Sequence, residues 1–425
     1  MSTARTNPGG PLRGEATVAG DKSITQRAIL LGALAPGKTR IDGANPGADA
    51  AAALGIARAL GARAERRRTG LVIQGGHLRE SERVLDARNS GTALRLSTGL
   101  LAAQPFLSVL TGDASLRRRP VARVLQPLSA LGADVTARDQ GRFPPVVVRG
   151  RALHGAEVRT GVPSAQVKSA VLLAAIQAAG STTVVEPAPT RDHTERMLPL
   201  FGATVRRDGN TIRVGGPALL HAAEVRVPGD LSAAAFLLAA ASLVPGSAIR
   251  LRDVGVNPTR TAFLDLLARM GAPVARENER DWGGEPVADL LAGGATLRPV
   301  TVRAAEAPSL IDELPLVAVL AAFARGTSEI RGAEELRVKE SDRIAAIAVG
   351  LEAIGVRVEE HPDGWTIHGV GRARGGMVEA GGDHRTAMAF LIAGLRARDG
   401  VTVRGSDAAR VSDPEFLPRL RGLIG

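Results

Sequence analysis

The segment Leu336–Arg343, read Leu-Arg-Val-Lys-Glu-Ser-Asp-Arg, concentrates side chains that could perform a group transfer. Lys339 and Arg343 are four residues apart, so on a helix they would share one face, with Glu340 beside them. Two cations of this kind can hold phosphate, and a carboxylate can move a proton. The same run could instead be a solvated charged face, so the rest of the chain has to decide between these interpretations.

Polar side chains also stand where two N-terminal apolar runs begin. Lys22 is placed to approach a carboxylate or a phosphate, and Arg27 follows about one turn later. Gly91 would allow a ligand to come close to the backbone, and Thr92 offers a hydroxyl and an N–H. Each run could equally be an ordinary helix start. The runs are Asp21–Arg27 (DKSITQR) and Asn89–Arg95 (NSGTALR).

A basic turn and a third helix start follow. In Arg117–Pro120 the proline constrains the geometry of Arg119 most strongly, and at least two of the three arginines are expected to be solvated. At the third start, Ser164 and Gln166 can hydrogen-bond a phosphate or a hydroxyl group. Lys168 could do the same or merely face solvent. His193, in a later loop, is expected to be a structural hydrogen-bonding residue, because no other ligand stands at metal spacing.

Two further starts lie in the C-terminal half. Asp312 and Glu313 precede an apolar run, where acids satisfy a helix dipole, although a buried Asp312 would be a candidate base. Asp383-His384-Arg385 opens the last apolar run with a cation, against the dipole, and such a local violation indicates function.

Composition restricts the class of protein. The 425 residues exceed one ordinary core, so two domains are expected. There is no cysteine, which excludes disulfides, thiolate metal sites and a cysteine nucleophile and fits a cytosolic protein. No signal peptide or transmembrane run is recognisable. The net charge of +11 favours anionic partners, but aromatic residues make up only 2% and the arginines are dispersed, so small phosphorylated metabolites fit at least as well as nucleic acid.

An internal repeat organises the chain as an α/β protein. An apolar helix entered by Ser or Asp recurs six times, at Ser23, Ser90, Ser164, Ser232, Ser309 and Asp383. A second, amphipathic helix ending near a glycine alternates with it. Six units predict two domains of three units each, joined by short hinges at Gly20-Asp21 and Val227–Asp230, with a loop insertion at Glu277–Gly294. Helix N-termini that converged on a cleft would attract anions.

Taken together, these motifs resemble the 5-enolpyruvylshikimate-3-phosphate synthase family. The resemblance runs from about Leu12 to about Phe416, and the combination of KESDR, DHR and the Lys22 segment is highly specific. The sequence segments SAQVKSAVLLA, GDASL and VPGD resemble those of the bacterial branch known for glyphosate tolerance. The motifs on which the resemblance rests are DKSITQR, NSGTALR, RP, SAQVKS, TRDHTE, DELP, LRVKESDR and DHRTAM.

The resemblance implies the enolpyruvyl transferase fold, an inside-out α/β barrel of two domains with six βαβαββ units, three in each domain. Residues 21–228 would form the N-terminal domain, and residues 1–20 plus 229–425 the C-terminal domain, with hinges near 20–21 and 228–229. The first strand, near residues 12–19, would join the C-terminal half. The two domains would close over the substrates.

The implied reaction moves the enolpyruvyl group of phosphoenolpyruvate to the 5-hydroxyl of shikimate 3-phosphate and releases phosphate, without metal or organic cofactor. Asp312 would be the base, and Glu340 with Lys22 the proton donor. Shikimate 3-phosphate would contact Lys22, Ser23, Arg27, Ser164, Ala165, Gln166, Arg191, Asp312 and Lys339. Phosphoenolpyruvate would contact Lys22, Gly91, Thr92, Arg119, Gln166, Arg343 and Arg385.

Two positions bear on how closely the chain follows the family. Many relatives carry a lysine just before the final helix, where this chain has Val411 next to Arg410. Tolerant relatives commonly carry alanine where this chain has Gly91, so the site is expected to admit glyphosate better than its overall similarity suggests.

The alternatives are a UDP-N-acetylglucosamine enolpyruvyl transferase, which usually has a reactive cysteine, and a basic nucleic-acid-binding repeat protein. The favoured interpretation is a cytoplasmic, monomeric enzyme of aromatic amino-acid biosynthesis that acts on small molecules and contacts neither nucleic acid nor membrane.

Overall fold

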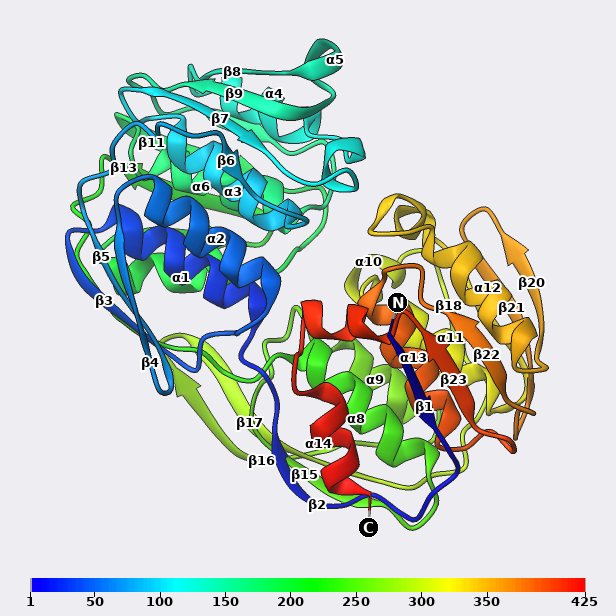
Figure 1. Cartoon of the computed structure of the whole chain (residues 1–425). Helices are drawn as coiled ribbons and strands as arrows, with labels where there is room; N and C mark the ends of the chain where they lie inside the picture. The colour runs from blue at the N-terminus through cyan, green and yellow to red at the C-terminus, as the bar shows by residue number, and fades with distance from the viewer. Residues whose placement is uncertain (1, 425) are drawn as a thin grey trace. The chain divides into compact units, whose positions relative to one another are not determined.

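The computed structural model describes residues 2–424, and within them the strands form six sheets, five with four strands and one with three. The chain divides into two compact units. The N-terminal unit comprises Gly20–Val227 and Asp281–Glu285, and the C-terminal unit comprises the residues up to Ala19, Pro228–Arg280 and the residues from Pro286 onwards. In each unit three sheets accompany a set of buried helices, which Figure 1 labels.

The sheets of the N-terminal unit have the orders β14-β3-β5-β4, β6-β7-β9-β8 and β10-β11-β13-β12. Their strands are β3 (Gly37–Asp42), β4 (Arg63–Arg67), β5 (Gly70–Gly75), β6 (Leu85–Asp86), β7 (Leu107–Thr111), β8 (Asp134–Ala137), β9 (Phe143–Arg149), β10 (Glu157–Arg159), β11 (Gly180–Val185), β12 (Val205–Asp208), β13 (Thr211–Gly216) and β14 (Glu224–Arg226). The helices are α1 (Lys22–Leu34), α2 (Ala48–Ala59), α3 (Gly91–Leu101), η1 (Leu116–Arg118), α4 (Ala122–Ser129), α5 (Arg138–Gly141), α6 (Ala165–Ala175), α7 (His193–Met197) and η2 (Leu198–Phe201).

The sheets of the C-terminal unit have the orders β16-β17-β15-β2, β18-β19-β21-β20 and β1-β23-β22. Their strands are β1 (Thr3–Thr6), β2 (Arg13–Thr17), β15 (Ala248–Gly255), β16 (Ala275–Trp282), β17 (Glu285–Gly293), β18 (Thr301–Val302), β19 (Arg325–Ile330), β20 (Arg357–His361), β21 (Gly364–Val370), β22 (Gly376–Glu379) and β23 (Val401–Arg404). The helices are α8 (Leu231–Leu243), α9 (Ala262–Arg269), α10 (Ala307–Leu310), α11 (Leu314–Ala322), η3 (Glu334–Val338), α12 (Arg343–Ala353), α13 (His384–Gly394), η4 (Ser406–Val411) and α14 (Phe416–Leu423).

The strand that precedes the first helix of each half pairs with a strand of the opposite half. β2 comes before α1 but pairs with β15, and β14 comes before α8 but pairs with β3. β2 pairs in parallel with β15, and Ala16 lies opposite Leu251. β14 pairs in parallel with β3, and Val225 lies opposite Ile41. The first predicted strand therefore joins the C-terminal half, as the family resemblance implies. The sixth repeat ends at α14 within the described residues, and β1, which the sequence did not predict, completes its sheet beside β23.

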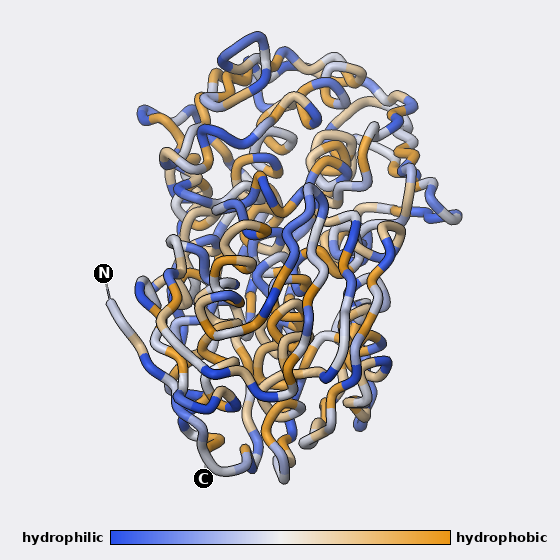
Figure 2. Tube along the Cα trace, turned by 90° about the vertical axis from the view of Figure 1, so that its right-hand side faces the viewer, coloured by the Kyte–Doolittle hydropathy of each residue, from blue (hydrophilic) through white to orange (hydrophobic). Residues whose placement is uncertain are grey.

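The core of the C-terminal unit is built on two helices that are apolar around their whole circumference. α8 and α11 consist mostly of Ala, Leu and Val, and nearly all their residues are buried, as expected for helices enclosed by sheets. The trace in Figure 2 shows apolar residues running through its interior and polar residues at many outer loops. No helix among residues 2–424 is long and apolar enough to cross a membrane.

One glycine sets the spacing of two core helices. A Cβ atom on Gly99 of α3 would lie 2.0 Å from the carbonyl oxygen of Ala170 of α6, a separation that atoms cannot occupy. Alanine at this position would therefore push α3 and α6 apart. Both helices begin at residues that the sequence predicts to bind substrate.

The predicted helix starts are partly wrong. Asp21, not Ser23, caps α1, because its carboxylate accepts a hydrogen bond from the N–H of Ile24 at 2.8 Å. Asp230 caps α8 in the place predicted for Ser232. An aspartate two residues earlier competes successfully for the same free N–H groups.

The predicted starts in the other repeats have mixed outcomes. Ser90 caps α3 and Asp383 caps α13, as predicted, while Ser164 precedes α6 without a capping hydrogen bond from its side chain. Ser309 lies inside the short α10.

The segment Glu277–Gly294, predicted as a loop insertion, forms most of the β16–β17 hairpin. Its tip, Asp281–Glu285, belongs to the N-terminal unit. There the guanidinium group of Arg226 lies over the ring of Trp282 at 3.4 Å, and His193 Nδ1 lies 2.8 Å from Glu285 Oε1. His193 is thus a buried structural hydrogen-bonding residue, as predicted.

The same hairpin contains a carboxylate whose lowered pKa makes the free energy of unfolding depend on pH. Burial alone would raise the pKa of Asp289, but hydrogen bonds from Asn278, from the Asp253 N–H and from Arg280 lower it to about 2. A lowered pKa contributes stability above the unfolded value of 3.8 and loses it as the pH falls toward 2. Asp289→Asn should therefore remove at most about 2 kcal/mol at pH 7 and reduce the acid sensitivity between pH 4 and 2.

The measurement is urea unfolding from pH 7 to pH 2 in a Trp282→Phe background, followed by the fluorescence of Trp365, which lies buried in the same unit as Asp289. Asp399→Asn, at an exposed position of that unit, is the control and should keep the wild-type pH dependence. Equal acid sensitivity in Asp289→Asn and the wild type would contradict the assignment.

Candidate functional site

In the N-terminal unit, side chains tie together the first turns of α1, α3 and α6. Ser90 Oγ lies 2.8 Å from Gln26 Oε1, which joins α3 to α1. Arg27 Nη2 donates to Ser169 Oγ at 2.7 Å, which joins α1 to α6. Further hydrogen bonds, described below, join α6 to α3. The three helix starts predicted to bind substrate therefore lie together within this unit.

Arg27 is a buried cation held by hydroxyl groups. Its Nε donates to Thr194 Oγ1 at 2.7 Å, and its Nη1 donates to the backbone oxygen of Ser23 at 3.0 Å. Burial lowers the pKa of Arg27 to about 10, while Glu195 and Asp21 act in the opposite direction. The group remains charged at neutral pH, so it can balance a phosphate or a carboxylate. Arg191, also predicted to bind, is half-buried and lies close enough to oppose the charge of Arg27.

Lys22 opens α1 and has a carboxylate partner that sequence reasoning missed. Its Nζ lies 2.9 Å from Asp49 Oδ2, at the start of α2, and both side chains are partly buried. This ion pair fixes the lysine beside the predicted anion site. Ser23, the next residue, is also partly buried at the start of the helix.

Gln166 joins α6 to α3 through both ends of its amide. Its Oε1 accepts from Arg95 Nη1 at 2.8 Å, and its Nε2 donates to Thr92 Oγ1 at 2.9 Å. Arg95 is buried and also donates from Nη2 to the backbone oxygen of Pro120 at 2.9 Å. Arg95 was not among the predicted site residues, although its position one turn after Gly91 in the NSGTALR motif was a usable signal.

The predicted difference within the basic turn is confirmed. Arg117 and Arg118 are exposed, whereas Arg119 is partly buried. Arg119 Nη2 donates to Asn89 Oδ1 at 2.5 Å and to Ser115 Oγ at 3.1 Å. The side chain is thereby held near the start of α3, in the direction of Gly91.

Lys168 contradicts both interpretations offered from the sequence. Its side chain is fully buried, so it neither faces solvent nor is open to a ligand. Its Nζ lies 2.8 Å from Glu186 Oε2 and 2.7 Å from Glu195 Oε1. Lys168 is the fourth residue of α6, and its side chain points into the interior of the unit. This lysine is therefore a structural cation between two buried carboxylates.

In the C-terminal unit, Arg343 links the KESDR segment to α13. Its Nε lies 2.7 Å from Asp383 Oδ2, and its Nη2 lies 2.5 Å from Glu340 Oε2. Burial opposes the charged form, but Asp383 and Glu340 outweigh it and raise the pKa of Arg343 above its ordinary value. Burial also opposes the charged form of Asp383 and would raise its pKa. The charge of Arg343 outweighs burial and lowers the pKa of Asp383. Arg343 is thus a permanent cation, as a phosphate site requires.

The prediction that Lys339 and Arg343 share one helical face is wrong. Lys339 follows the 3-10 turn η3, and α12 begins only at Arg343. Asp342 caps α12 by accepting from the N–H of Ala345 at 3.1 Å, which excludes the preceding residues from the helix. Lys339 instead lies 2.7 Å from Glu335, while Glu340 remains beside Arg343 as predicted.

Arg385 sits at the start of α13 next to the DELP segment. Its Nη1 donates to the backbone oxygen of Asp312, and its Nη2 lies 3.8 Å from Asp312 Oδ2. The arginine is buried, whereas Asp312 is partly exposed. Arg410, near the position of the family lysine, is exposed on η4, and Val411 is half-buried.

Each unit therefore presents cations and carboxylates at helix N-termini. Free N–H groups and the helix dipole favour anions there, and Arg and Lys add full charges. The clusters suit substrates that carry phosphate and carboxylate groups, with Asp312 and Glu340 available for proton transfer.

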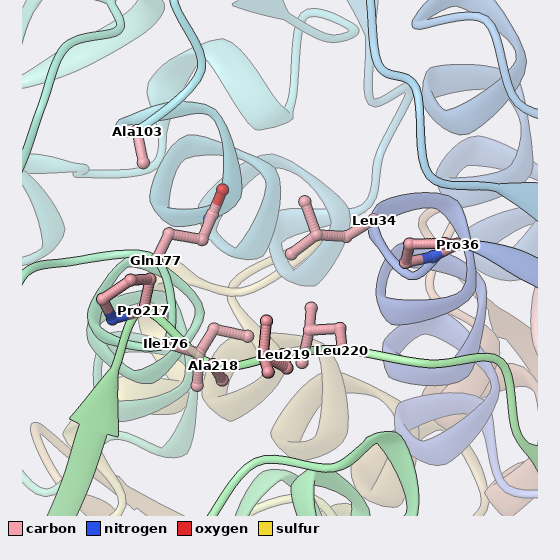
Figure 3. A pocket seen from close by; sticks show the side chains of 9 residues that line it. All are labelled: Leu34, Pro36, Ala103, Ile176, Gln177, Pro217, Ala218, Leu219 and Leu220. Atoms are coloured by element: carbon pink, nitrogen blue, oxygen red, sulfur yellow. The ribbon is translucent and has the colours of Figure 1, made fainter.

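A separate groove lies at the opposite ends of the same helices. Its volume is about 430 Å³, and it is lined mainly by apolar side chains, including Leu34 at the end of α1 and Ile176 at the end of α6 (Figure 3). Helix C-termini disfavour anions, and none of the predicted site residues lines this groove. It is not the site predicted for phosphorylated substrates.

The sequence of the chain is similar to those of known proteins. The sequence profile of "EPSP synthase (3-phosphoshikimate 1-carboxyvinyltransferase)" matches residues 6–420. A 3-phosphoshikimate 1-carboxyvinyltransferase of Alkalilimnicola ehrlichii is 50% identical, covering 96% of this chain and 93% of the relative. One from an Anaeromyxobacter species is 51% identical, covering 97% of this chain and 96% of the relative.

Solved structures agree. The EPSP synthase of Acinetobacter baumannii superposes with a TM-score of 0.88 and 41% identity, covering 100% of this chain and 98% of that chain. The enolpyruvyl transferase NikO of Streptomyces tendae has a TM-score of 0.80 over 99% of this chain and 96% of that chain, and at 21% identity it shows the shared fold. The two-domain enolpyruvyl transferase fold predicted from the motifs is therefore confirmed, and the chain belongs to the EPSP synthase family.

Proposed function

We propose that this protein is a 3-phosphoshikimate 1-carboxyvinyltransferase of the shikimate pathway. The 5-hydroxyl oxygen of shikimate 3-phosphate bonds to C2 of phosphoenolpyruvate, and the C2–O bond to phosphate breaks. A proton is added to the methylene carbon and later lost, so that 5-enolpyruvylshikimate 3-phosphate and phosphate result. The observation that carries the proposal is the match to the family over residues 6–420, together with charged clusters at the helix N-termini of both units.

The first substrate site is proposed from these clusters. Arg27, fixed by Thr194 and Ser169, neutralises negative charge, and Lys22 stands one turn earlier on the same helix. Polar groups at the start of α6 offer hydrogen bonds to hydroxyl groups. Shikimate 3-phosphate would contact Lys22, Ser23, Arg27, Ser164, Ala165, Gln166, Arg191, Asp312 and Lys339.

The second substrate site uses the guanidinium groups of both units. Arg119 beside α3 and Arg343 and Arg385 at α12 and α13 supply forked donors suited to a phosphate and a carboxylate. Phosphoenolpyruvate would contact Lys22, Gly91, Thr92, Arg119, Gln166, Arg343 and Arg385. Because these groups are divided between the units, we propose that the two domains close on the substrates.

Three side chains are proposed to move protons. Asp312 takes the proton of the 5-hydroxyl group. Its Oδ2 lies 3.8 Å from Nη2 of Arg385, a residue of the proposed phosphoenolpyruvate site, and this proximity supports the role. Glu340 gives a proton to the methylene carbon, assisted by Lys22. In this structure Glu340 is paired with Arg343, so phosphoenolpyruvate that binds Arg343 would free the carboxylate for this role.

The test is phosphate release from phosphoenolpyruvate. Release that depends on shikimate 3-phosphate is expected, and release that depends instead on UDP-N-acetylglucosamine would contradict the proposal. Salt-dependent binding to arbitrary DNA without turnover would support the nucleic-acid-binding alternative.

The remaining features belong to the same proposal. The protein is a cytoplasmic monomer that needs no cofactor and has no nucleic-acid or membrane partner, and its domain hinges lie near residues 20–21 and 228–229. Light scattering of the active protein checks the monomer, and full activity after extensive chelation checks the cofactor statement.

Gly91→Ala is expected to weaken glyphosate binding more than phosphoenolpyruvate binding. The added Cβ atom would lie 2.5 Å from Arg95 Nη1 and 3.8 Å from Arg119 Nη1, so the guanidinium group of Arg95 must move. That group holds Gln166, and glyphosate is the longer of the two ligands. One methyl group in a closed site discriminates by roughly 10- to 200-fold, and the glyphosate inhibition constant should rise within that range.

The measurement is inhibition competitive with phosphoenolpyruvate in the wild type and the variant. Gly55→Ala is the matched control, because its Cβ atom would meet nothing within 4 Å on α2. A wild type already insensitive to glyphosate, or an active Gly91→Ala with unchanged inhibition, would refute the steric argument.

A further inference from the structure

Four buried polar side chains form a continuous line inside the C-terminal unit, ending at Arg385. They are Arg260, Ser232, Glu313 and Arg385, with exposed fractions of 6%, 7%, 4% and 7%. Only the last belongs to the proposed substrate site. Buried polar groups of this kind are costly unless each has partners, so their arrangement requires an explanation.

The hydrogen bonds of this line converge on Glu313 from both ends. Arg260 Nη2 donates to Ser232 Oγ at 2.6 Å, and Ser232 Oγ donates to Glu313 Oε1. The same Oε1 atom lies 3.5 Å from Arg385 Nη1. Because a guanidinium group has no acceptor, the Ser232 hydroxyl must accept from Arg260 and give its own proton to Glu313.

The far end of the line is anchored to the backbone of α8. Asp230 accepts from the N–H of Ser232 at 2.8 Å and lies 3.3 Å from Arg260 Nη2. Charges alternate along the path, with Asp230 and Glu313 negative and Arg260 and Arg385 positive. Each charge has an opposite charge near it, so the line is fixed in place without a net buried charge.

We propose that Ser232 and Arg260 are positioning residues for the phosphoenolpyruvate site and act on Arg385 through Glu313. This inference rests on the proposed function. The backbone oxygen of Asp312 holds Arg385 Nη1 from one side, and Glu313 holds it from another. With its Oε1 already engaged by Ser232, Glu313 orients the guanidinium group without closing on it, which leaves donors for the anion.

Loss of the Ser232 hydroxyl changes this balance. Glu313 would then be free to turn fully toward Arg385, and a buried carboxylate paired directly with the arginine would compete with phosphoenolpyruvate. Binding of phosphoenolpyruvate should weaken, while groups that contact only shikimate 3-phosphate in the N-terminal unit stay unchanged. The expected signature is a substrate-selective change in KM.

The test is Ser232→Ala, with steady-state kinetics in both substrates. The KM for phosphoenolpyruvate should rise on the order of 10-fold, equivalent to about 1.4 kcal/mol, and the KM for shikimate 3-phosphate should stay within about twofold. Ser242→Ala is the matched control, since Ser242 is buried on the same helix and donates only to the backbone oxygen of Leu238. It should leave both KM values unchanged.

Arg260→Lys provides a second, independent variant. A single nitrogen atom, Arg260 Nη2, contacts both Asp230 and Ser232. Lysine keeps the positive charge but replaces the planar guanidinium group with an ammonium group on a different stem, so it should hold Ser232 less firmly, and the KM for phosphoenolpyruvate should rise by a smaller factor than in Ser232→Ala. An unchanged KM for phosphoenolpyruvate in both folded variants, or an equal rise for both substrates, would overturn the inference. A wild type that releases no phosphate would instead overturn the proposed function, so the two failures are distinguishable.

Discussion

Glu340→Gln is expected to lower kcat by roughly 100-fold or more, the loss that follows removal of a general acid. Glutamine keeps the size of the side chain and an oxygen that can accept from Arg343, which lies 2.5 Å from Glu340 Oε2 in the wild type. It cannot deliver a proton to the methylene carbon. Both KM values should therefore change little, because Arg343 remains anchored by Asp383 at 2.7 Å.

The kinetic measurement needs a control for the change of charge. Glu334→Gln makes the same chemical change at an exposed position of η3, a few residues earlier. Its kcat should stay within about twofold of the wild type, as expected for an exposed site. Near-normal kcat in Glu340→Gln would remove Glu340 from the mechanism. A large rise in KM for phosphoenolpyruvate at unchanged kcat would assign it to binding instead.

Lys168→Met is expected to destabilise the N-terminal unit by roughly 3 to 5 kcal/mol, which is the cost of breaking a buried ion pair by removing one partner. Methionine fills most of the volume but leaves the carboxylates of Glu186 and Glu195 buried without their shared cation. Glu195 is also one of the charges that support Arg27, so the loss extends toward the substrate site.

The two tryptophans of the chain make this stability measurable for one unit at a time. Trp282 belongs to the N-terminal unit and Trp365 to the C-terminal unit. In a Trp365→Phe background, urea unfolding followed by fluorescence reports on the unit that contains Lys168. Lys38→Met, at an exposed position of β3, should shift the transition by less than about 0.5 kcal/mol.

A second substitution separates charge from packing. Adding Glu195→Gln to Lys168→Met removes one of the stranded carboxylates, so the double variant should regain part of the lost stability. A Lys168→Met protein as stable as the Lys38→Met control would show that the buried lysine is not needed to neutralise its neighbours.

The sequence predicted the fold class and the approximate positions of the apolar helices, although only Ser90 and Asp383 cap their helices as predicted. These features depend on short-range patterns. Apolar runs, an N-terminal Ser or Asp and a closing glycine recur at each repeat, and the family motifs lie at the same points. The chain segment that contains Arg119 was also interpreted correctly, since Pro120 restricts it locally.

What the sequence could not predict depends on three-dimensional neighbours. From the sequence, Lys168 can be a ligand or a solvated residue, because its partners, Glu186 and Glu195, lie far along the chain. The sequence does not indicate the contact of Arg95 with Gln166, because their hydrogen bond crosses from α3 to α6. The prediction that Lys339 and Arg343 share a helical face is wrong for a local reason. Asp342 caps α12, so the helix begins only after Lys339.

The exchange of β2 and β14 has a consequence for how the protein is made on the ribosome. β2 leaves the exit tunnel early, but its partner β15 begins only at Ala248, after the whole segment Gly20–Val227 has been synthesised. That segment contains every strand of its own three sheets, so it can fold while translation continues. Until β15 appears, β2 is an unpaired edge strand, short and carrying charged residues at Arg13 and Glu15, features that limit wrong pairing during the wait.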